Sequence, residues 1–273
     1  MNENPNVSND TPPPYDVIGD VHGCIDELRE LLDQLGYVDT DEGGVKHPSG
    51  RTLVFVGDLA DRGPANMAVW KLALATSESG AAFLAPGNHD NKFARYLMGR
   101  NVQLTHGLES TTREYRALPD REQKALSRAI LRLVVDGPPY LILDGGKLVV
   151  AHAGLEAWMI GKVNKRISSF ARYGEQTGEL TATGLPVRRD WANDYRGKAL
   201  IVYGHTPTAT PDVCNTTINI DQGCAFGGGL TALRYPEREI VTVAARRVYA
   251  TPSMVERAAG LVPAAVAGNE DTG

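Results

Sequence analysis

Cysteine is scarce in this sequence: there are three residues among 273, and no two of them form a Cys-x-x-Cys pair. An odd number of cysteines without such a pair argues against a disulfide framework and against a zinc site made of thiolates. We therefore expect free thiols in a reducing cytoplasm. Cys24 and Cys224 are expected to be small packed residues rather than nucleophiles, because no base is assigned to them.

The sequence also lacks long apolar runs and an excess of basic residues. No run approaches the ~20 apolar residues that a membrane-spanning helix requires. The polar, proline-rich start lacks the charged and apolar regions of a signal peptide. With a formal net charge of -5, a protein that wraps duplex DNA is not expected. We predict a cytoplasmic protein without a membrane partner, and nothing in the sequence indicates an oligomeric state.

A hydrophobic content of 42% is enough for one large domain with a sizeable core. We predict this domain over residues 15–250, between disordered tails at 1–14 and 256–273. Residues 155–198 look irregular and insert-like. Residues 161–198 include eight Lys and Arg residues and four Asp and Glu residues, which gives a local net charge of +4. This segment is either a solvated loop or a basic cap that faces an anionic substrate, with Arg188 and Arg189 as candidate contacts.

Apolar runs and helical periodicity alternate along the chain, which predicts an α/β domain. Strands are predicted at 15–19, 52–56, 81–85, 140–143, 147–151, 200–203, 216–220, 229–235 and 239–244. Helices are predicted at 24–36, 65–78, 88–98 and 106–136.

Five of the predicted strands end in residues that can bind metal ions or phosphate. The motifs are Gly-Asp-Val-His-Gly at 19–23, Gly-Asp-Leu-Ala-Asp-Arg-Gly at 57–63, Gly-Asn-His-Asp at 87–90, His-Ala-Gly at 152–154 and Gly-His-Thr-Pro at 204–207. Ligands of open α/β sheets bind at the carboxyl ends of the strands. Chance placement of six histidines would not produce this regularity, so the strand ends predict one shared site.

The donors at these strand ends are carboxylates, imidazoles and one amide, without a thiolate. This set suits Mn²⁺, Fe, Zn²⁺ or Ni²⁺ better than Mg²⁺ or Ca²⁺. Two divalent ions ~3.5–4 Å apart can clamp phosphorus for in-line displacement, and they lower the pKa of a shared water from 15.7 towards ~7. They need a carboxylate between them, and Asp58 is the natural candidate for this bridge.

The residues around the second and third motifs predict the acid and the phosphate contact. His89 directly follows Asn88, so the two side chains cannot easily serve the same ion, and His89 is better placed as the general acid. Asp61 is a reasonable carboxylate to orient it. Arg62 can bind phosphate oxygens with its guanidinium group.

In this order, the five motifs resemble those of the calcineurin-like metallophosphoesterases. Asp-Arg-Gly at 61–63 narrows the resemblance to the phosphoprotein-phosphatase branch. Further stretches are similar to the phosphatase domain of bacterial polynucleotide kinase-phosphatase: 23–28, 102–108, 173–175, 202–207 and 217–228. The resemblance implies a four-layer α/β/β/α sandwich with mixed sheets and a dinuclear metal site at the carboxyl ends of the strands.

The resemblance also implies roles for individual residues. One metal would be held by Asp20, His22 and Asp58, and the second by Asp58, Asn88, His152 and His205. Asp61, Arg62 and His89 match the acid-and-phosphate group, and Asn88 is also a candidate substrate contact. Asp221 matches a further acidic position near the site. Mn²⁺ is the expected metal.

We therefore expect a dinuclear-metal-dependent phosphoesterase in which a metal-bridging hydroxide attacks nucleotide or RNA-end phosphates. A Ser/Thr protein phosphatase is one alternative, although Asp90 stands where the eukaryotic enzymes have Glu. A dinucleoside tetraphosphate hydrolase is another. An inactive nucleotide-binding module is a third, but such proteins usually lose one or more ligands. Because the sequence contains no kinase P-loop and no ligase motif, the phosphatase domain would stand alone.

Overall fold

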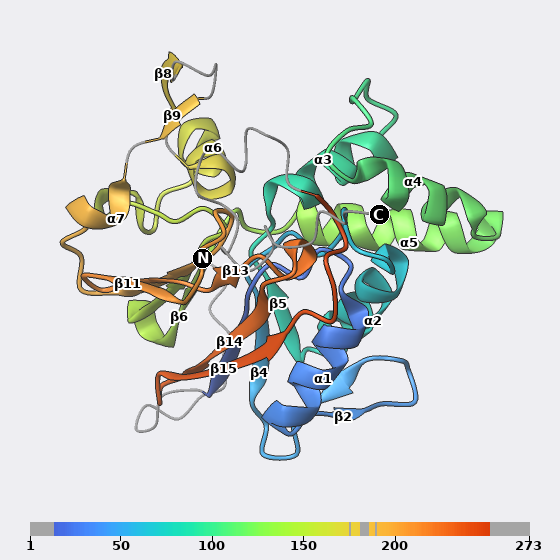
Figure 1. Ribbon diagram of the computed structural model, residues 1–273, viewed down its shortest axis with the longest axis horizontal. Coiled ribbons are helices and arrows are strands. Elements are labelled where there is room, and N and C mark those ends of the chain that lie inside the picture. Colours follow the sequence, from blue (N-terminus) through green and yellow to red (C-terminus); the bar gives the residue numbers. More distant parts are fainter. Residues whose placement is uncertain (1–13, 175, 181–185, 189, 252–273) are drawn as a thin grey trace, which may run out of the picture.

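Two β-sheets pack face to face in the computed structural model, which describes residues 14–174, 176–180, 186–188 and 190–251 (Figure 1). The first sheet has the order β13-β14-β1-β4-β5, and β15 pairs with β14. Its strands are β1 (Tyr15–Ile18), β4 (Thr52–Phe55), β5 (Ala82–Leu84), β13 (Asp221–Gln222), β14 (Gly229–Tyr235) and β15 (Glu239–Ala244). Because β1, β4 and β5 are parallel while β14 runs against β1, the sheet is mixed, as expected.

The second sheet has the order β11-β12-β10-β7-β6. Its strands are β6 (Leu141–Leu143), β7 (Leu148–Val150), β10 (Leu200–Tyr203), β11 (Asp212–Cys214) and β12 (Thr217–Asn219). Strands β7, β10 and β12 are parallel, so their carboxyl ends lie at one edge. Two small hairpins lie outside both sheets: β2 (Val38–Asp39) with β3 (Val45–Lys46), and β8 (Gln176–Leu180) with β9 (Pro186–Arg188).

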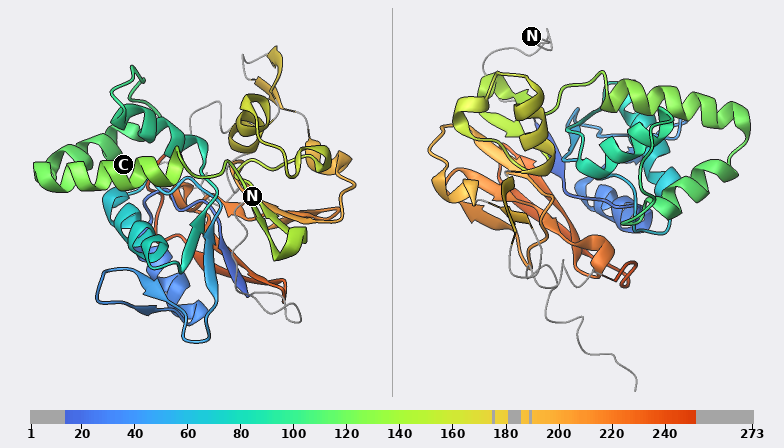
Figure 2. Two further views of the ribbon diagram at one scale, coloured as in Figure 1. Left: turned by 180° about the vertical axis from the view of Figure 1, so that it is seen from behind. Right: turned by 90° about the horizontal axis from the view of Figure 1, so that it is seen from above.

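Helices cover the outer face of each sheet, which gives the four layers (Figure 2). The first sheet is covered by α1 (Ile25–Leu35), α2 (Asn66–Glu78), α3 (Asn88–Leu97), α4 (Leu108–Ala117) and α5 (Asp120–Val134). The second is covered by α6 (Lys165–Tyr173) and α7 (Trp191–Asp194). Three short 3₁₀ helices are η1 (Asp144–Gly146), η2 (Ala157–Met159) and η3 (Cys224–Phe226). Among the described residues, no helix is long and apolar enough to cross a bilayer.

Successive residues of the central strands belong to different hydrophobic clusters. Ile18 packs beneath the helices α1–α5, whereas its neighbour Val17 packs between the two sheets. Val150 faces the same inter-sheet layer, and Val149 packs under α6 and α7. Since side chains alternate across a strand, continuous apolar runs are buried on both faces. This double burial confirms the predicted four-layer sandwich.

Two predicted segments differ from the structure. The prediction of a single helix at 106–136 was wrong, because Leu118 and Pro119 separate α4 from α5. Leu118 is extended, with ψ 152°, as a residue before proline prefers.

The irregular segment expected at 155–198 contains α6, whose N-cap Asn164 accepts a hydrogen bond from the backbone of Ile167 at 2.9 Å. Ile167 then packs against the second sheet. Of the tails predicted at 1–14 and 256–273, all but residue 14 lies outside the described residues.

Candidate metal centre

The polar strand ends of both sheets meet in one place. Asp20 and His22 follow β1, Asp58 follows β4, and Asn88 begins α3 after β5. From the second sheet, His152 follows β7 and His205 follows β10. The parallel strands of each sheet end at the same edge, and packing of the two sheets brings the two edges together. The structure thus unites all six residues that were predicted to bind metal.

Asp58 lies between the histidines of the two sheets. Its Oδ2 is 3.6 Å from Nε2 of His22 and 3.4 Å from Nε2 of His152. Its Oδ1 accepts a hydrogen bond from the backbone of His89 at 2.9 Å. Burial would raise the pKa of Asp58, but the surrounding histidines outweigh burial and hold the pKa well below its ordinary value. Asp58 is therefore a buried carboxylate placed to be shared, as its sequence position indicates.

On one side of Asp58, which we call the His152 side, the donors Asn88, His152 and His205 converge. Nδ1 of His152 contacts the carbonyl of Val56 at 3.1 Å, which directs Nε2 into the site. That Nε2 lies 2.9 Å from Oδ1 of Asn88 and 3.1 Å from Nδ1 of His205. Burial would lower the pKa of His152, yet Asp58 and Asp20 raise it to about 9. These atoms belong to residues that follow three different strands, β5, β7 and β10, and they point at one another.

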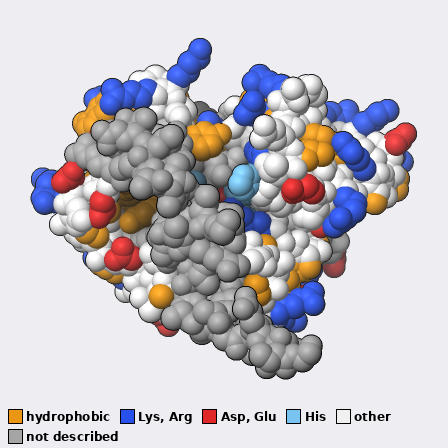
Figure 3. Space-filling model, turned by 45° about the horizontal axis from the view of Figure 1, so that its top comes forward, with side chains coloured by type: hydrophobic (Ala, Val, Ile, Leu, Met, Phe, Trp, Pro, Cys, Tyr) orange, Lys and Arg blue, Asp and Glu red, His pale blue; other side chains and the backbone are white. Residues whose placement is uncertain are grey.

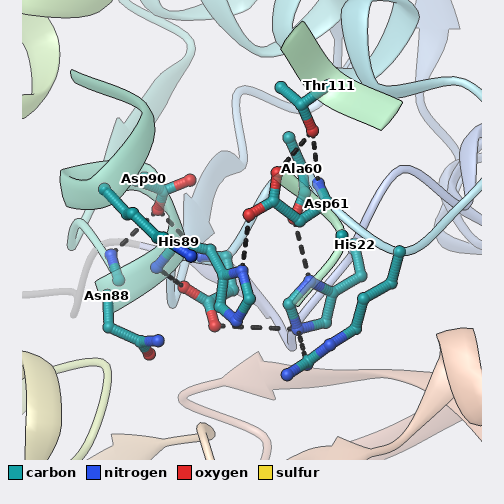
Figure 4. A network of polar contacts seen from close by, with 12 residues as sticks. His22, Ala60, Asp61, Asn88, His89, Asp90 and Thr111 are labelled. Carbon is teal, nitrogen blue, oxygen red and sulfur yellow. Dashed lines mark hydrogen bonds and ion pairs between the residues drawn. The ribbon is translucent and has the colours of Figure 1, made fainter. Parts of the chain in front are cut away.

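On the other side, which we call the His22 side, ligand and phosphate contacts are mixed. Nδ1 of His22 contacts the carbonyl of Ala60 at 2.9 Å, so Nε2 faces the site (Figure 4). Nη1 of Arg62 lies 2.7 Å from this Nε2. The guanidinium of Arg62 also lies over the ring of Phe226, 4.8 Å from its centroid. Phe226 therefore helps to hold Arg62, a role that the sequence analysis missed.

His89 belongs to a chain of buried polar contacts. Its Nδ1 lies 2.6 Å from Oδ2 of Asp61, and the ring is turned edge-on to His22, with centroids 4.9 Å apart (Figure 4). The hydroxyl of Thr111 donates to the other carboxylate oxygen of Asp61, and it accepts from the Asp61 backbone at 3.1 Å. The predicted pairing of His89 with Asp61 is thus present. Thr111 lies 50 residues from Asp61, and no sequence signal pointed to it.

Asp90 fixes the loop that carries Asp58. Its carboxylate accepts hydrogen bonds from the backbone nitrogens of Asp58 at 2.8 Å, Leu59 at 3.0 Å and Gly87 at 2.9 Å. Burial and the nearby Asp58 raise the pKa of Asp90 to about 6. A Cβ at Gly87 would collide with the Asp58 carboxylate, so this position requires glycine. Asp90, which stands where the eukaryotic enzymes have Glu, therefore fixes the backbone of the loop that carries Asp58.

Asp20 and Asp221 lie beside the two sides. Oδ2 of Asp20 accepts from the backbone of His205 at 3.1 Å, while its buried Oδ1 has no hydrogen-bond partner among the described residues. Burial and the neighbouring Asp221 raise the pKa of Asp20 well above its ordinary value. Burial likewise raises the pKa of Asp221 to about 6. Such crowded, buried carboxylates favour the binding of cations.

Several site residues have left-handed backbone conformations that are rare for residues other than glycine. The values of φ are 46° for His22, 50° for Asp58, 72° for Asp61, 73° for Arg62 and 73° for His205. Such conformations persist only where the surrounding structure imposes them, and they cluster at functional sites. The strain therefore supports the assignment of this edge as the functional site.

The donor set fits two divalent cations. The two groups His22-Asp58-His89 and Asp58-His152-His205 each place one donor atom per residue within 4.8 Å of the others. Both groups share Asp58, and neither contains a thiolate. His89 stands in the first group, where the resemblance had placed Asp20. Arg188 ends β9, and Arg189 lies outside the described residues, so these two predicted contacts stay predictions.

Two neighbouring donor groups that share one carboxylate define a dinuclear metal site of the kind found in metal-dependent hydrolases. A family model described as calcineurin-like phosphoesterase matches residues 13–234, and the chain belongs to this family. The protein is accordingly a metal-dependent phosphoric ester hydrolase.

Named relatives narrow the comparison. The chain is 51% identical over 228 residues to bis(5'-nucleosyl)-tetraphosphatase PrpE (asymmetrical) of Geobacillus sp., covering 84% of this chain and 93% of the relative. It is 52% identical to the protein of the same name from Geobacillus thermodenitrificans, with the same coverage. These names support the tetraphosphatase alternative and do not single out polynucleotide kinase-phosphatase.

The fold is also similar to solved structures of phosphatases. A protein serine/threonine phosphatase from Saccharomyces cerevisiae superposes with a TM-score of 0.57 at 16% sequence identity. The match covers 90% of this chain and 83% of the yeast chain. At this identity, the likeness concerns the fold alone.

Proposed function

We propose that this protein hydrolyses dinucleoside tetraphosphates within the broader class of nucleotide phosphates. The geometry that carries the proposal is the position of Asp58, whose Oδ2 lies between Nε2 of His22 and Nε2 of His152. The names of the Geobacillus relatives supply the substrate class. RNA-end phosphates remain the second candidate, which the basic segment within 161–198 favours.

The cation ligands would divide between the two sides of Asp58. Asn88, His152 and His205 would hold one ion, and His22 with Asp20 would hold the other, both sharing Asp58. Bound cations supply Lewis-acid stabilisation of phosphate oxygens and an activated water for attack on phosphorus. We further propose Mn²⁺ as the metal and the cytoplasm as the location.

The chain itself supplies the proton and the phosphate contact. Nδ1 of His89 is oriented by Asp61, so the other ring nitrogen is free to hold a proton for the leaving oxygen. Thr111 keeps Asp61 in this orientation. Arg62 can turn its guanidinium from His22 to the phosphate oxygens. Lys and Arg side chains lie along the upper edge and the right side of the face shown in Figure 3, and their charge suits a polyphosphate.

The decisive experiment supplies diadenosine tetraphosphate and Mn²⁺ and identifies the products. Asymmetrical cleavage adds water across one outer phosphoanhydride bond and yields AMP and ATP in equal amounts, whereas symmetrical cleavage yields two ADP. We expect AMP and ATP. Parallel reactions contain a phosphopeptide, a 3'-phosphorylated nucleotide and a 2',3'-cyclic nucleotide. Turnover of the phosphopeptide alone would contradict the proposal, and an active metal-free preparation would contradict the mechanism.

A further inference from the structure

A second cluster of potential metal ligands lies behind the turn that carries His22. The thiols of Cys24 and Cys224 and a carboxylate oxygen of Glu27 lie within 4.8 Å of one another. All three residues are at most 1% exposed. We call them the Cys24 cluster. The hydrolytic site contains no thiolate, so this cluster has a different chemistry and lies outside it.

The carboxylate of Glu27 has one oxygen that is paired and one that is not. Its Oε1 accepts hydrogen bonds from the backbone of Arg246 at 2.9 Å and from the hydroxyl of Tyr249 at 2.7 Å. Its Oε2 is fully buried and has no hydrogen-bond partner within the described part of the chain. A buried carboxylate oxygen without a partner is costly, because burial removes the water that would otherwise solvate it.

Three distant segments meet at the cluster. Cys24 precedes α1, Glu27 lies in the first turn of that helix, and Cys224 belongs to η3. The segment after β15 closes the cluster, since the backbone nitrogens of Tyr249 and Ala250 donate to the carbonyl of Ala225 at 3.0 and 2.9 Å. Tertiary packing therefore brings Cys224 to Cys24 and Glu27, from which it is separated by about 200 residues in the sequence.

We propose that Cys24, Glu27 and Cys224 form a structural binding site for a thiophilic divalent cation, Zn²⁺ by preference. Two thiolates and a carboxylate occupy three corners of a tetrahedron, in which Zn–S bonds of ~2.3 Å place sulfur atoms ~3.8 Å apart. On binding, two S–H bonds break, two Zn–S bonds form and two protons pass to solvent. Thiolates select Zn²⁺ over the harder ions that suit the oxygen-rich site.

The site would stiffen the hydrolytic centre without taking part in the reaction. Without the ion, the thiol of Cys24 donates to the backbone carbonyl of His22 at 3.7 Å. On binding, the bond from Cys24 to the ion would replace this hydrogen bond and anchor the turn that presents His22. A hydrogen bond with Cys24, which favours the protonated form, and burial raise the pKa of Cys224, so the unliganded thiol is a poor nucleophile.

Cobalt substitution tests the proposal, because only a thiolate ligand gives a sulfur-to-cobalt charge-transfer band in the near ultraviolet. The full chain is produced in medium in which Co²⁺ replaces Zn²⁺, since the buried cluster would take up its ion on folding. We expect the band in the wild type and in Cys214→Ser, whose thiol lies elsewhere, and its loss in Cys224→Ser. Wild-type protein without the band would overturn the proposal.

Two further measurements keep the outcome decisive if Cys224→Ser folds poorly. Metal analysis of wild-type protein grown with Zn²⁺ should give one Zn²⁺ that resists dialysis beyond the ions of the hydrolytic site. Glu27→Gln should weaken its retention by roughly tenfold or more. A mass for the unreduced chain that is two hydrogens low would indicate a Cys24–Cys224 disulfide and overturn the proposal. Neither measurement depends on phosphatase activity or on its substrate.

Discussion

The two sides of Asp58 hold similar donors but differ in what accompanies them. On the His152 side, Nε2 of His152 lies 2.9–3.4 Å from the potential ligands Asn88, His205 and Asp58. On the His22 side, the guanidinium of Arg62 contacts the ligand nitrogen, and the His89–Asp61 pair lies beside it. One side is therefore suited to hold a cation, whereas the other must also bind the phosphate and move a proton.

This difference teaches that a dinuclear site need not be symmetrical in function. A group that donates a proton has to reach the leaving oxygen, so it cannot be enclosed by ligands. His89 meets this requirement because Asp61 occupies one ring nitrogen only. Substitutions on the two sides should therefore have separable effects on catalysis and on metal content.

The largest effect is expected from Asp58→Asn, which removes the charge that both sides share. Hydrolysis should fall on the order of 10³-fold or more, because the site loses its central electrostatic element. Both bound cations should be retained less well. Steady-state kinetics and metal analysis on the same preparation test this, and a variant that keeps two ions and its rate would show that Asp58 is not shared.

His89→Asn should lower kcat by about 10²–10⁴-fold on a substrate whose leaving group needs a proton. The loss should be smaller on p-nitrophenyl phosphate, because nitrophenolate leaves without protonation. Metal content should not change. Since His89 also lies in a potential ligand group with His22 and Asp58, a variant that lost one ion would instead identify His89 as a ligand.

Asn88→Ala should act mainly on the His152 side. The amide oxygen lies 2.9 Å from Nε2 of His152, so its removal should weaken the binding of one cation. The loss of affinity should be at least the ~10–100-fold that follows removal of a group hydrogen-bonded to a metal ligand. Calorimetric titration with Mn²⁺ should show two sites in the wild type, one of which is weakened in the variant. Equal weakening of both would argue against two distinct sides.

Thr111→Val should lower kcat by roughly tenfold, because Asp61 loses the hydroxyl that orients it. Thr112→Val is the matched control. Thr112 is also buried, but its hydroxyl donates to the carbonyl of Glu109 at 3.1 Å, away from the His22 side. Equal losses in the two variants would indicate general damage to α4 rather than a role in positioning.

The smallest effect concerns the stability of protein freed of metal with a chelator. The pKa of His152 is raised to about 9 in the folded chain, against ~6.5 in an unfolded one. Its contribution to stability is therefore full below pH 6.5 and is lost as the pH rises through about 9. Thermal melts across this range should show the decline, and His152→Asn should reduce it. An unchanged slope in this variant would assign the decline to other groups.

The sequence predicted the site well because its signals are local. Each motif couples a strand end to ligands two to four residues away, as in Asp20 and His22 after β1. Thr111 and Phe226 carry no such signal, since each meets its partner only through folding. The break at Pro119 was overlooked because the apolar stripe continues in α5, although proline and the residue before it are poor helix formers. Short strands such as β13 are set by pairing rather than by pattern.

The order and composition of the strand-end motifs determined the family chemistry of this protein, because donor atoms at parallel strand ends converge whatever the details of packing. Only the tertiary structure decided that Oδ2 of Asp58 lies between His22 of one sheet and His152 of the other. It also decided that Cys24 and Cys224 meet at Glu27. The physical reason is that contacts between sheets, and between residues 200 positions apart, depend on packing that no local pattern encodes.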